Sequence, residues 1–277
     1  VRHPNVVGIY DFGYERGRAW IAMESAPGQP LRRLLGGSAL PVRPALRLCA
    51  QVAAGVWEAH RRGVLHGNLS SANVFVTLGE DSRAVVADFG TTATLDQQKG
   101  ALSGVLAYQA PEAIYALGDR ASQSPQSDVF SLGVVAYEML SGRLPFASAP
   151  GEPANAEQSL RAQLFEDPPL LHELDRTIPS YVSEVVTRAL HKEATLRYAS
   201  MREAGEAFEQ ALQRCSDERP TFSPRILRTK LGATLAGAVV ALLLSLLVVG
   251  TSTLVLPVAE HSSTVSPESV TLEEVAP

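Results

Sequence analysis

Four polar residues in two short stretches have the types and spacing of a catalytic centre. The stretch VLHGNLSSANVFV, residues 64–76, contains His66, Asn68 and Asn73, and Asp88 opens an Asp-Phe-Gly triplet further on. Phosphoryl-transfer enzymes use a His, then a catalytic Asp two residues later, then an Asn five residues after that. Here the catalytic position is Asn68, whose amide cannot accept a proton near neutral pH. The stretch therefore has the spacing of such a loop without its base.

The segments around these residues predict an α+β arrangement that would position them. Apolar alternation at 5–14 and 18–25, interrupted by a Gly-containing turn, is typical of an antiparallel strand pair. Residues 43–62 carry apolar side chains at spacings of three and four, which predicts a helix leading into the loop. Two β-like runs, 73–78 and 84–89, come next, and a polar stretch continues to about residue 107 as a surface loop.

The second half of the chain predicts helices. Residues 127–140 are apolar on every side of a helix, which indicates a buried central helix, with Ser127 or Asp128 as its cap. Amphipathic patterns predict further helices at about 155–166, 179–192 and 200–214.

Composition excludes several classes of protein. Apolar residues make up 45% of the 277 residues and charged residues 19%, as in a globular protein. A net charge of −5 gives no reason to expect nucleic-acid binding. Cys49 and Cys215 lie far apart without metal-ligand spacing and are expected to be reduced thiols.

One segment, residues 231–258, has no charged residue over 28 positions and predicts a single transmembrane helix. Arg225, Arg228 and Lys230 precede it, whereas the tail 259–277 contains four glutamates and no Lys or Arg. The positive-inside rule therefore places the preceding residues in the cytoplasm and the short acidic tail outside a cell membrane.

Small residues within this segment allow two such helices to pair. Ala233, Gly237 and Ala241 recur at every fourth position, the small-xxx-small pattern. This pattern permits a homodimer through the helix.

Eight motifs occur in one order along the chain: HPNVV (3–7), MES (23–25), HGNLSSAN (66–73), DFG (88–90), APE (110–112), SDVFSLGV (127–134), GRLPF (142–146) and Arg197. Together they resemble the eukaryotic-type protein kinase family, in its bacterial transmembrane Ser/Thr form, over residues 1–214. The resemblance implies a kinase-like α+β fold, mainly the helical C-lobe plus the last N-lobe strands, followed by one transmembrane helix. The implied domains are N-lobe strands and hinge (1–26), C-lobe (27–214), juxtamembrane linker (215–230), membrane helix (231–258) and extracytoplasmic tail (259–277).

The resemblance also implies a nucleotide site. Asp88 and Asn73 would hold Mg²⁺, which binds hard carboxylate and amide oxygens. Met23 would be the gatekeeper, and Glu24 and Ala26 would offer backbone groups to the adenine of ATP.

Phe75 lies where the family has a smaller aliphatic residue under the adenine, so its ring either narrows the pocket or simply packs. The family's Gly-rich loop and ATP-binding Lys precede the HPN motif and are expected upstream of Val1. Binding of ATP and Mg²⁺ is conditional on that upstream N-lobe.

Five further residues have implied structural roles. His66 and Phe89 would pack together in the internal hydrophobic spine. Asp128 would accept hydrogen bonds from backbone amides of the catalytic loop. Glu112 would pair with Arg197 across the lobe.

The departures from the family are concentrated at the transfer chemistry. Asn68 replaces the catalytic Asp, Ser70 the Lys that steadies the transferring phosphate, and Val105 the Thr that hydrogen-bonds both. Gly67 replaces the Arg that pairs with a phosphorylated activation loop. The three replaced residues bond to one another in the family. Their joint replacement therefore indicates that phosphate transfer has been lost, rather than that the positions changed by chance.

Three interpretations follow. The favoured one is a membrane-anchored pseudokinase that binds protein partners, and ATP with Mg²⁺, but transfers phosphate poorly or not at all. The alternative is an active Ser/Thr kinase acting on protein hydroxyls, because the loose transition state needs positioning more than a strong base. The third is a membrane-held remnant without a nucleotide role.

Overall fold

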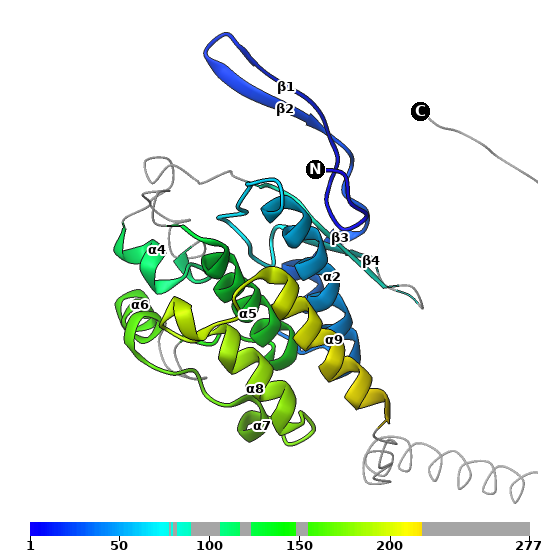
Figure 1. The fold of residues 1–277 in the computed structure, drawn as a ribbon. Helices are drawn as coiled ribbons and strands as arrows, with labels where there is room; N and C mark the ends of the chain where they lie inside the picture. Colours follow the sequence, from blue (N-terminus) through cyan, green and yellow to red (C-terminus); the bar gives the residue numbers. More distant parts are fainter. Residues whose placement is uncertain (78, 80–81, 90–105, 117–122, 148–154, 218–277) are drawn as a thin grey trace, which may run out of the picture. The chain divides into compact units, whose positions relative to one another are not determined.

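The computed structural model describes residues 1–77, 79, 82–89, 106–116, 123–147 and 155–217, within one compact unit that ends at Arg219 (Figure 1). Strands and helices alternate in the first part of the chain and helices make up the second part, as predicted for this α+β chain. In chain order the elements are β1 (Ile9–Glu15), β2 (Arg18–Met23), β3 (Gln29–Pro30), α1 (Leu31–Leu35), α2 (Val42–His60), β4 (Val74–Thr77), β5 (Arg83–Val86), α4 (Pro111–Tyr115), α5 (Pro125–Ser141), α6 (Ala156–Phe165), α7 (Leu171–Leu174), α8 (Ser180–Ala189), η2 (Ala194–Leu196) and α9 (Met201–Asp217).

The first two strands form the predicted antiparallel hairpin. β1 pairs with β2 from Ile9–Met23 to Glu15–Arg18. Arg16 and Gly17 both have positive φ, at 50° and 80°, as a two-residue hairpin turn requires. The aromatic residues of β1 are largely exposed, with Phe12 at 77%.

A three-stranded antiparallel sheet, in the order β3-β4-β5, brings two of the predicted site residues to the same edge. Val74, the first residue of β4, pairs with Val86, the last of β5. Asn73 precedes β4 and Asp88 follows β5, and the Ala87 N–H donates to the Asn73 carbonyl at 2.9 Å. The register of the sheet therefore places these two polar residues side by side.

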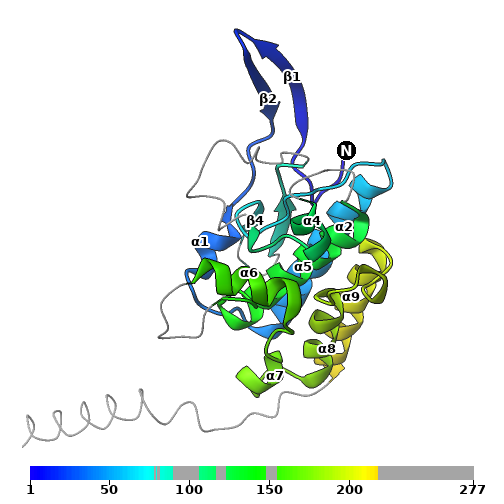
Figure 2. The same ribbon diagram turned by 90° about the vertical axis from the view of Figure 1, so that its left-hand side faces the viewer.

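Helix α5 is the buried centre of the helical part, as its all-round apolar sequence predicts. Its residues pack against α2, α7, α8 and α9 (Figure 2). The predicted cap is wrong: the N-cap is Ser124, whose N–H donates to the Ser127 hydroxyl at 3.1 Å. Asp128 does not cap the helix because its carboxylate binds backbone amides of the loop before β4.

The other predicted helices are found with ends shifted by a few residues. α2 spans 42–60, α6 156–165, α8 180–189 and α9 201–217. α2 and α9 lie side by side, and Gly205 allows this contact because a Cβ there would meet the Ala53 Cβ at 3.1 Å.

The predicted transmembrane helix, the tail after it and most of the linker lie outside the described residues. Among the helices that the structure describes, none has the length and apolar character needed to cross a membrane.

Candidate functional site

The loop at His66–Asn68 is fixed by one buried carboxylate from the first turn of α5. Asp128 accepts hydrogen bonds from the backbone N–H groups of His66 and Gly67, each at 2.8 Å. His60, at the end of α2, brings its Nε2 within 2.7 Å of the same carboxylate, and both side chains are almost fully buried. Sequence reasoning missed His60, although its place six residues before His66 at a helix end was a usable signal. The carboxylate therefore joins α2, α5 and the loop.

His66 is a packing residue in this geometry. Its ring lies 4.5 Å from the Phe89 ring, the contact that the resemblance implies. Its Nδ1 accepts a hydrogen bond from the Asn68 N–H at 3.3 Å. Burial lowers the pKa of His66 despite the nearby Asp128 carboxylate, so its ring is neutral at pH 7. A neutral ring packed on Phe89 orients the loop without offering an acid.

Asn73 and Asp88 form a pair of oxygen donors at the edge of the sheet. The Asn73 Nδ2 donates to the Asn68 carbonyl at 2.8 Å, which fixes its side chain and leaves Oδ1 as an acceptor. Asp88 has φ +62°, a left-handed conformation that L-residues other than Asn and Asp rarely adopt. Within the described part of the chain, no three His, Cys, Asp or Glu residues gather around a cation-sized site. Two hard oxygens suit Mg²⁺, which usually keeps waters and phosphate oxygens as its other ligands.

The residues implied for the adenine fall into two groups. Ala26 and Phe75 pack together with Val7, Val85 and Ala87 in a small apolar cluster beside the Asp88 turn.

Met23 and Glu24 lie instead at the end of the hairpin. Met23 is 41% exposed, and the Glu24 N–H donates to the Gly8 carbonyl at 2.7 Å. Of the two backbone groups of Glu24, the carbonyl is therefore the one left to contact an adenine.

Neutral amides fill the surroundings of Gly67, where the family has its phosphate-binding Arg. Gly67 has φ +68°, and a Cβ there would lie 2.6 Å from the Gln123 Oε1. The Gln109 Nε2 donates to the Gly67 carbonyl at 3.1 Å. Gln163 on α6 donates to the carbonyls of Leu106 and Gln109, at 2.8 and 2.6 Å. Among the residues that the structure describes, the contacts on this side of the loop come from neutral amides.

The serines after the loop are turned into the protein. Ser70, at the family's Lys position, is only 8% exposed. Ser71 is fully buried, and its hydroxyl lies 2.9 Å from the Tyr108 hydroxyl, which donates to the Glu138 carboxylate at 2.6 Å. Val105 lies outside the described residues.

Glu112 and Arg197 form a bidentate ion pair. Their two N–O distances are 2.7 and 2.8 Å, and the Arg197 side chain is fully buried. Arg197 also donates to the carbonyls of His191, Lys192 and Gln126, so this guanidinium is well satisfied. Partial burial opposes ionisation of Glu112, but the hydrogen bonds and charge of Arg197 outweigh it and lower the pKa of the carboxyl.

Comparison with known proteins decides the family. Residues 1–222 match the protein kinase domain. The chain belongs to the protein kinase family. The helical part built around α5 and the strands β1 and β2 all lie within the matched residues.

Its relatives are bacterial Ser/Thr kinases. The chain is 32% identical over 210 residues to Ser/Thr-protein kinase PknA of Mycobacterium tuberculosis, covering 72% of this chain and 46% of PknA. It is 34% identical over 226 residues to Ser/Thr-protein kinase pkn2 of Myxococcus xanthus, covering 76% of this chain and 26% of that protein. The chain thus spans less than half the length of these relatives.

Solved structures show the same fold. The PknI kinase domain of Mycobacterium tuberculosis matches with a TM-score of 0.56 and 25% identity, over 76% of this chain and 72% of that one. Rad53 in complex with AMP-PNP matches with a TM-score of 0.57 and 22% identity, over 75% of this chain and 51% of that one.

Proposed function

We propose that this chain is a membrane-anchored Ser/Thr-kinase-like signalling module that binds Mg-ATP but transfers phosphate slowly or not at all. The observation that carries the proposal is the loop at residues 66–68. Asp128, paired with His60, holds its backbone in place, whereas Asn68 occupies the position of the base and Gly67 lies beside the amides of Gln109 and Gln123. The shape of the site is retained where its acid-base chemistry is absent.

The residues present fit the nucleotide and its metal. Asn73 and Asp88 would hold Mg²⁺, and Ala26 and Phe75 would contact the adenine. The bound metal neutralises charge on the phosphates. The hydrogen bond from Asn73 to the Asn68 carbonyl orients the Asn73 side chain, which would be one ligand of that metal. The left-handed backbone at Asp88 orients the second ligand, the Asp88 carboxylate.

Phosphate transfer should be slow because a positioned base contributes about 10²–10⁴-fold to a rate. Transfer of radiolabelled phosphate by the full-length protein, compared with its Asp88→Ala variant, tests this. Transfer at an ordinary kinase rate that Asp88→Ala abolishes would contradict the proposal and favour the second candidate, an active Ser/Thr kinase. That candidate is supported by the intact Asp128 contacts, because positioning supplies much of phosphoryl-transfer catalysis.

Nucleotide binding is tested separately by thermal shift. Mg-ATP should raise the melting temperature of the full-length protein, since a ligand that binds only the folded state stabilises it. The Asp88→Ala variant should respond less, because it lacks a metal ligand. No shift in the wild-type protein would leave only a scaffolding role.

Residues 231–258 are proposed to anchor the module in a cell membrane, with the kinase-like domain in the cytoplasm and the acidic tail outside. The uncharged sequence and the basic flank before it support this orientation. Pairing through Ala233 and Gly237 would bring two copies together. Extraction of membranes with alkaline carbonate should leave the protein in the pellet; release into the supernatant would contradict anchoring.

A further inference from the structure

A path of amide hydrogen bonds links helix α6 to the loop at residues 66–68. Gln163 on α6 is only 3% exposed, and its Nε2 donates to the carbonyls of Leu106 and Gln109, at 2.8 and 2.6 Å. The side chain of Gln109 reaches the loop itself, where its Nε2 donates to the Gly67 carbonyl at 3.1 Å. Two glutamine side chains, one after the other, therefore connect α6 to the loop.

Helix α5 supports the middle of this path, the segment 106–110. The buried Ser131 hydroxyl donates to the Tyr108 carbonyl at 2.7 Å, and the Tyr108 hydroxyl donates to the Glu138 carboxylate at 2.6 Å. The segment that carries Gln109 thus contacts both α5 and α6. The Gln109 side chain therefore extends toward the loop from a fixed backbone.

Gly67 is the residue of the loop that depends most on such a contact. Its φ is +68°, and a residue without a Cβ has the widest choice of backbone angles. The Gly67 N–H donates to Asp128 at 2.8 Å, which fixes the peptide before it. The Gln109 side chain holds the Gly67 carbonyl, which fixes the peptide after it. The two contacts together restrict both dihedral angles of this glycine.

The peptide after Gly67 leads to one of the two oxygen donors of the metal site. Its nitrogen belongs to Asn68, whose N–H donates to the His66 Nδ1 at 3.3 Å. The Asn68 carbonyl accepts the hydrogen bond from the Asn73 Nδ2 at 2.8 Å, and this bond orients the Asn73 Oδ1. A rotation of the peptide between Gly67 and Asn68 would therefore displace the acceptor that holds the Asn73 side chain.

We propose that Gln109 and Gln163 are positioning residues for the Mg²⁺ site. Gln163 holds the backbone of Gln109, the Gln109 side chain fixes the Gly67 carbonyl, and the loop in turn orients Asn73. The inference rests on the proposed binding of Mg-ATP, in which Asn73 is a metal ligand. One net hydrogen bond corresponds to about fivefold in an equilibrium constant, which sets the size of the expected effects.

Gln109→Met removes the donor and keeps the length of the side chain. The full-length variant should bind Mg-ATP about fivefold more weakly than the wild-type protein, as measured by titration calorimetry. Gln163→Met should weaken binding by a similar factor, through the displaced backbone of Gln109. Because Gln163 is buried, its variant can lose stability, whereas Gln109 is half-buried and its variant keeps the test decisive. Wild-type affinity in Gln109→Met would overturn the proposal.

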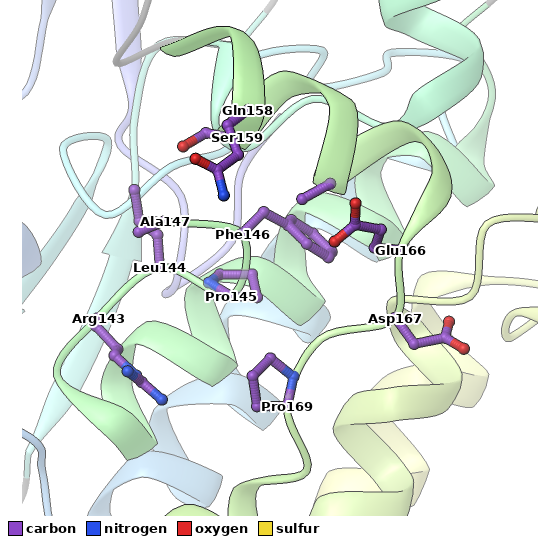
Figure 3. Close-up of a pocket in the computed structure, with 11 residues that line it drawn as sticks. Arg143, Leu144, Pro145, Phe146, Ala147, Gln158, Ser159, Glu166, Asp167 and Pro169 are labelled. Atoms are coloured by element: carbon purple, nitrogen blue, oxygen red, sulfur yellow. The ribbon is translucent and has the colours of Figure 1, made fainter. Parts of the chain in front are cut away.

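Gln158→Met is the matched control. Gln158 lies on the exposed face of α6, where it lines a pocket of about 320 Å³ together with Phe146 and Pro169 (Figure 3). The residue type, the substitution and the helix are the same as for Gln163, so the affinity for Mg-ATP should stay at the wild-type value. A loss equal to that of Gln163→Met would mean that any change on α6 weakens binding, and would overturn the assigned path.

The double variant Gln109→Met/Gln163→Met tests whether one glutamine acts through the other. If it does, the double variant should bind Mg-ATP no more weakly than Gln109→Met alone, because residues in one network are not additive. Losses that multiply would show two independent effects and would contradict the path.

The side-chain amide of Asn73 provides a readout that needs no nucleotide. Its hydrogen-bonded proton should exchange with solvent at least about threefold faster in Gln109→Met than in the wild-type protein or Gln158→Met, as measured by amide NMR of the full-length protein. Unchanged exchange would overturn the proposal whether or not Mg-ATP binds. Faster exchange in a protein that does not bind Mg-ATP would contradict the proposed function and support the positioning contacts.

Discussion

The two sides of the loop at residues 66–68 are held by opposite kinds of chemistry. On the side of α5, a buried carboxylate, Asp128, receives two backbone N–H groups and the ring of His60. On the other side, the amides of Gln109 and Gln123 meet Gly67. The carboxylate fixes the course of the backbone. The glutamine amides lie around Gly67, which stands where the family has an Arg that pairs with a phosphorylated activation loop.

The contrast separates shape from catalysis. Substitution of Asp128 would leave two backbone N–H groups and the buried His60 ring without their acceptor. Because breaking a buried pair lowers the free energy of unfolding strongly, this side of the loop is needed for the fold. Asp128 holds the loop through the backbone N–H groups of His66 and Gly67, and this anchor uses neither the Asn68 nor the Ser70 side chain. The loop can therefore keep its course with Asn68 and Ser70 in place of the family's Asp and Lys.

Asp128→Ala should give the largest effect on stability. It removes an acceptor shared by two amides and leaves His60 without its partner, which should cost about 3–5 kcal/mol of unfolding free energy. Urea denaturation measures it. Asp175→Ala is the control, because the carboxylate of the exposed Asp175 accepts one hydrogen bond from the residues that the structure describes, that of the Thr177 N–H, and its loss should cost about 1 kcal/mol. Equal losses in the two variants would show that the buried Asp128 contributes no more to stability than an exposed carboxylate.

Arg197→Met should cause the next largest loss of unfolding free energy, about 2–3 kcal/mol, because it leaves the Glu112 carboxylate without its bidentate partner. The pKa of Glu112 is lowered in the folded protein, so its contribution is present above its unfolded pKa of about 4.3 and is lost as the pH falls through the folded value. Urea denaturation from pH 7 to 3 should show a smaller acid-dependent loss in Arg197→Met than in the wild-type protein. Parallel pH profiles would contradict this assignment.

Much of the fold could be predicted from the sequence because its signals are local. The turn at Arg16–Gly17, the all-round apolar character of α5 and the periodicity of α2 each depend on neighbouring residues. The resemblance to kinases gave the backbone partners of Asp128, though not His60, and the Glu112–Arg197 pair.

What could not be predicted depends on residues distant in sequence. Gln123 and Gln109 meet Gly67 from segments about 40 to 60 residues away, and neither belongs to a motif. The cap of α5 was misassigned for a related reason: Asp128 has a short side chain suited to capping, but a long-range contact takes it. Long-range polar contacts of this kind follow from packing and leave no local pattern.

Gly67→Arg tests whether the uncharged side of the loop has closed around glycine. It should cost about 1–3 kcal/mol, from the left-handed backbone and from the contact with Gln123. Gly63→Arg is a matched control, because Gly63 has φ +73° but a Cβ there would meet no atom within 4 Å. The difference between the two variants isolates the Gln123 contact, and Gln123→Ala should remove that difference. No difference would mean that the glutamine moves aside freely.

Asn68→Asp should have the smallest effect, both on stability and on phosphate transfer. The exchange is nearly isosteric, so the unfolding free energy should change by about 0.5 kcal/mol or less. Transfer should rise by less than about tenfold, because a base alone does not restore the positive charge missing at Ser70, and catalytic groups that act as a unit are not additive. The double variant Asn68→Asp/Ser70→Lys should therefore gain more than the two single variants combined, measured by radiolabel transfer in the full-length protein. A gain of about 10² or more in the transfer rate from Asn68→Asp alone would contradict this expectation. It would show that the missing base is the only catalytic defect of the loop.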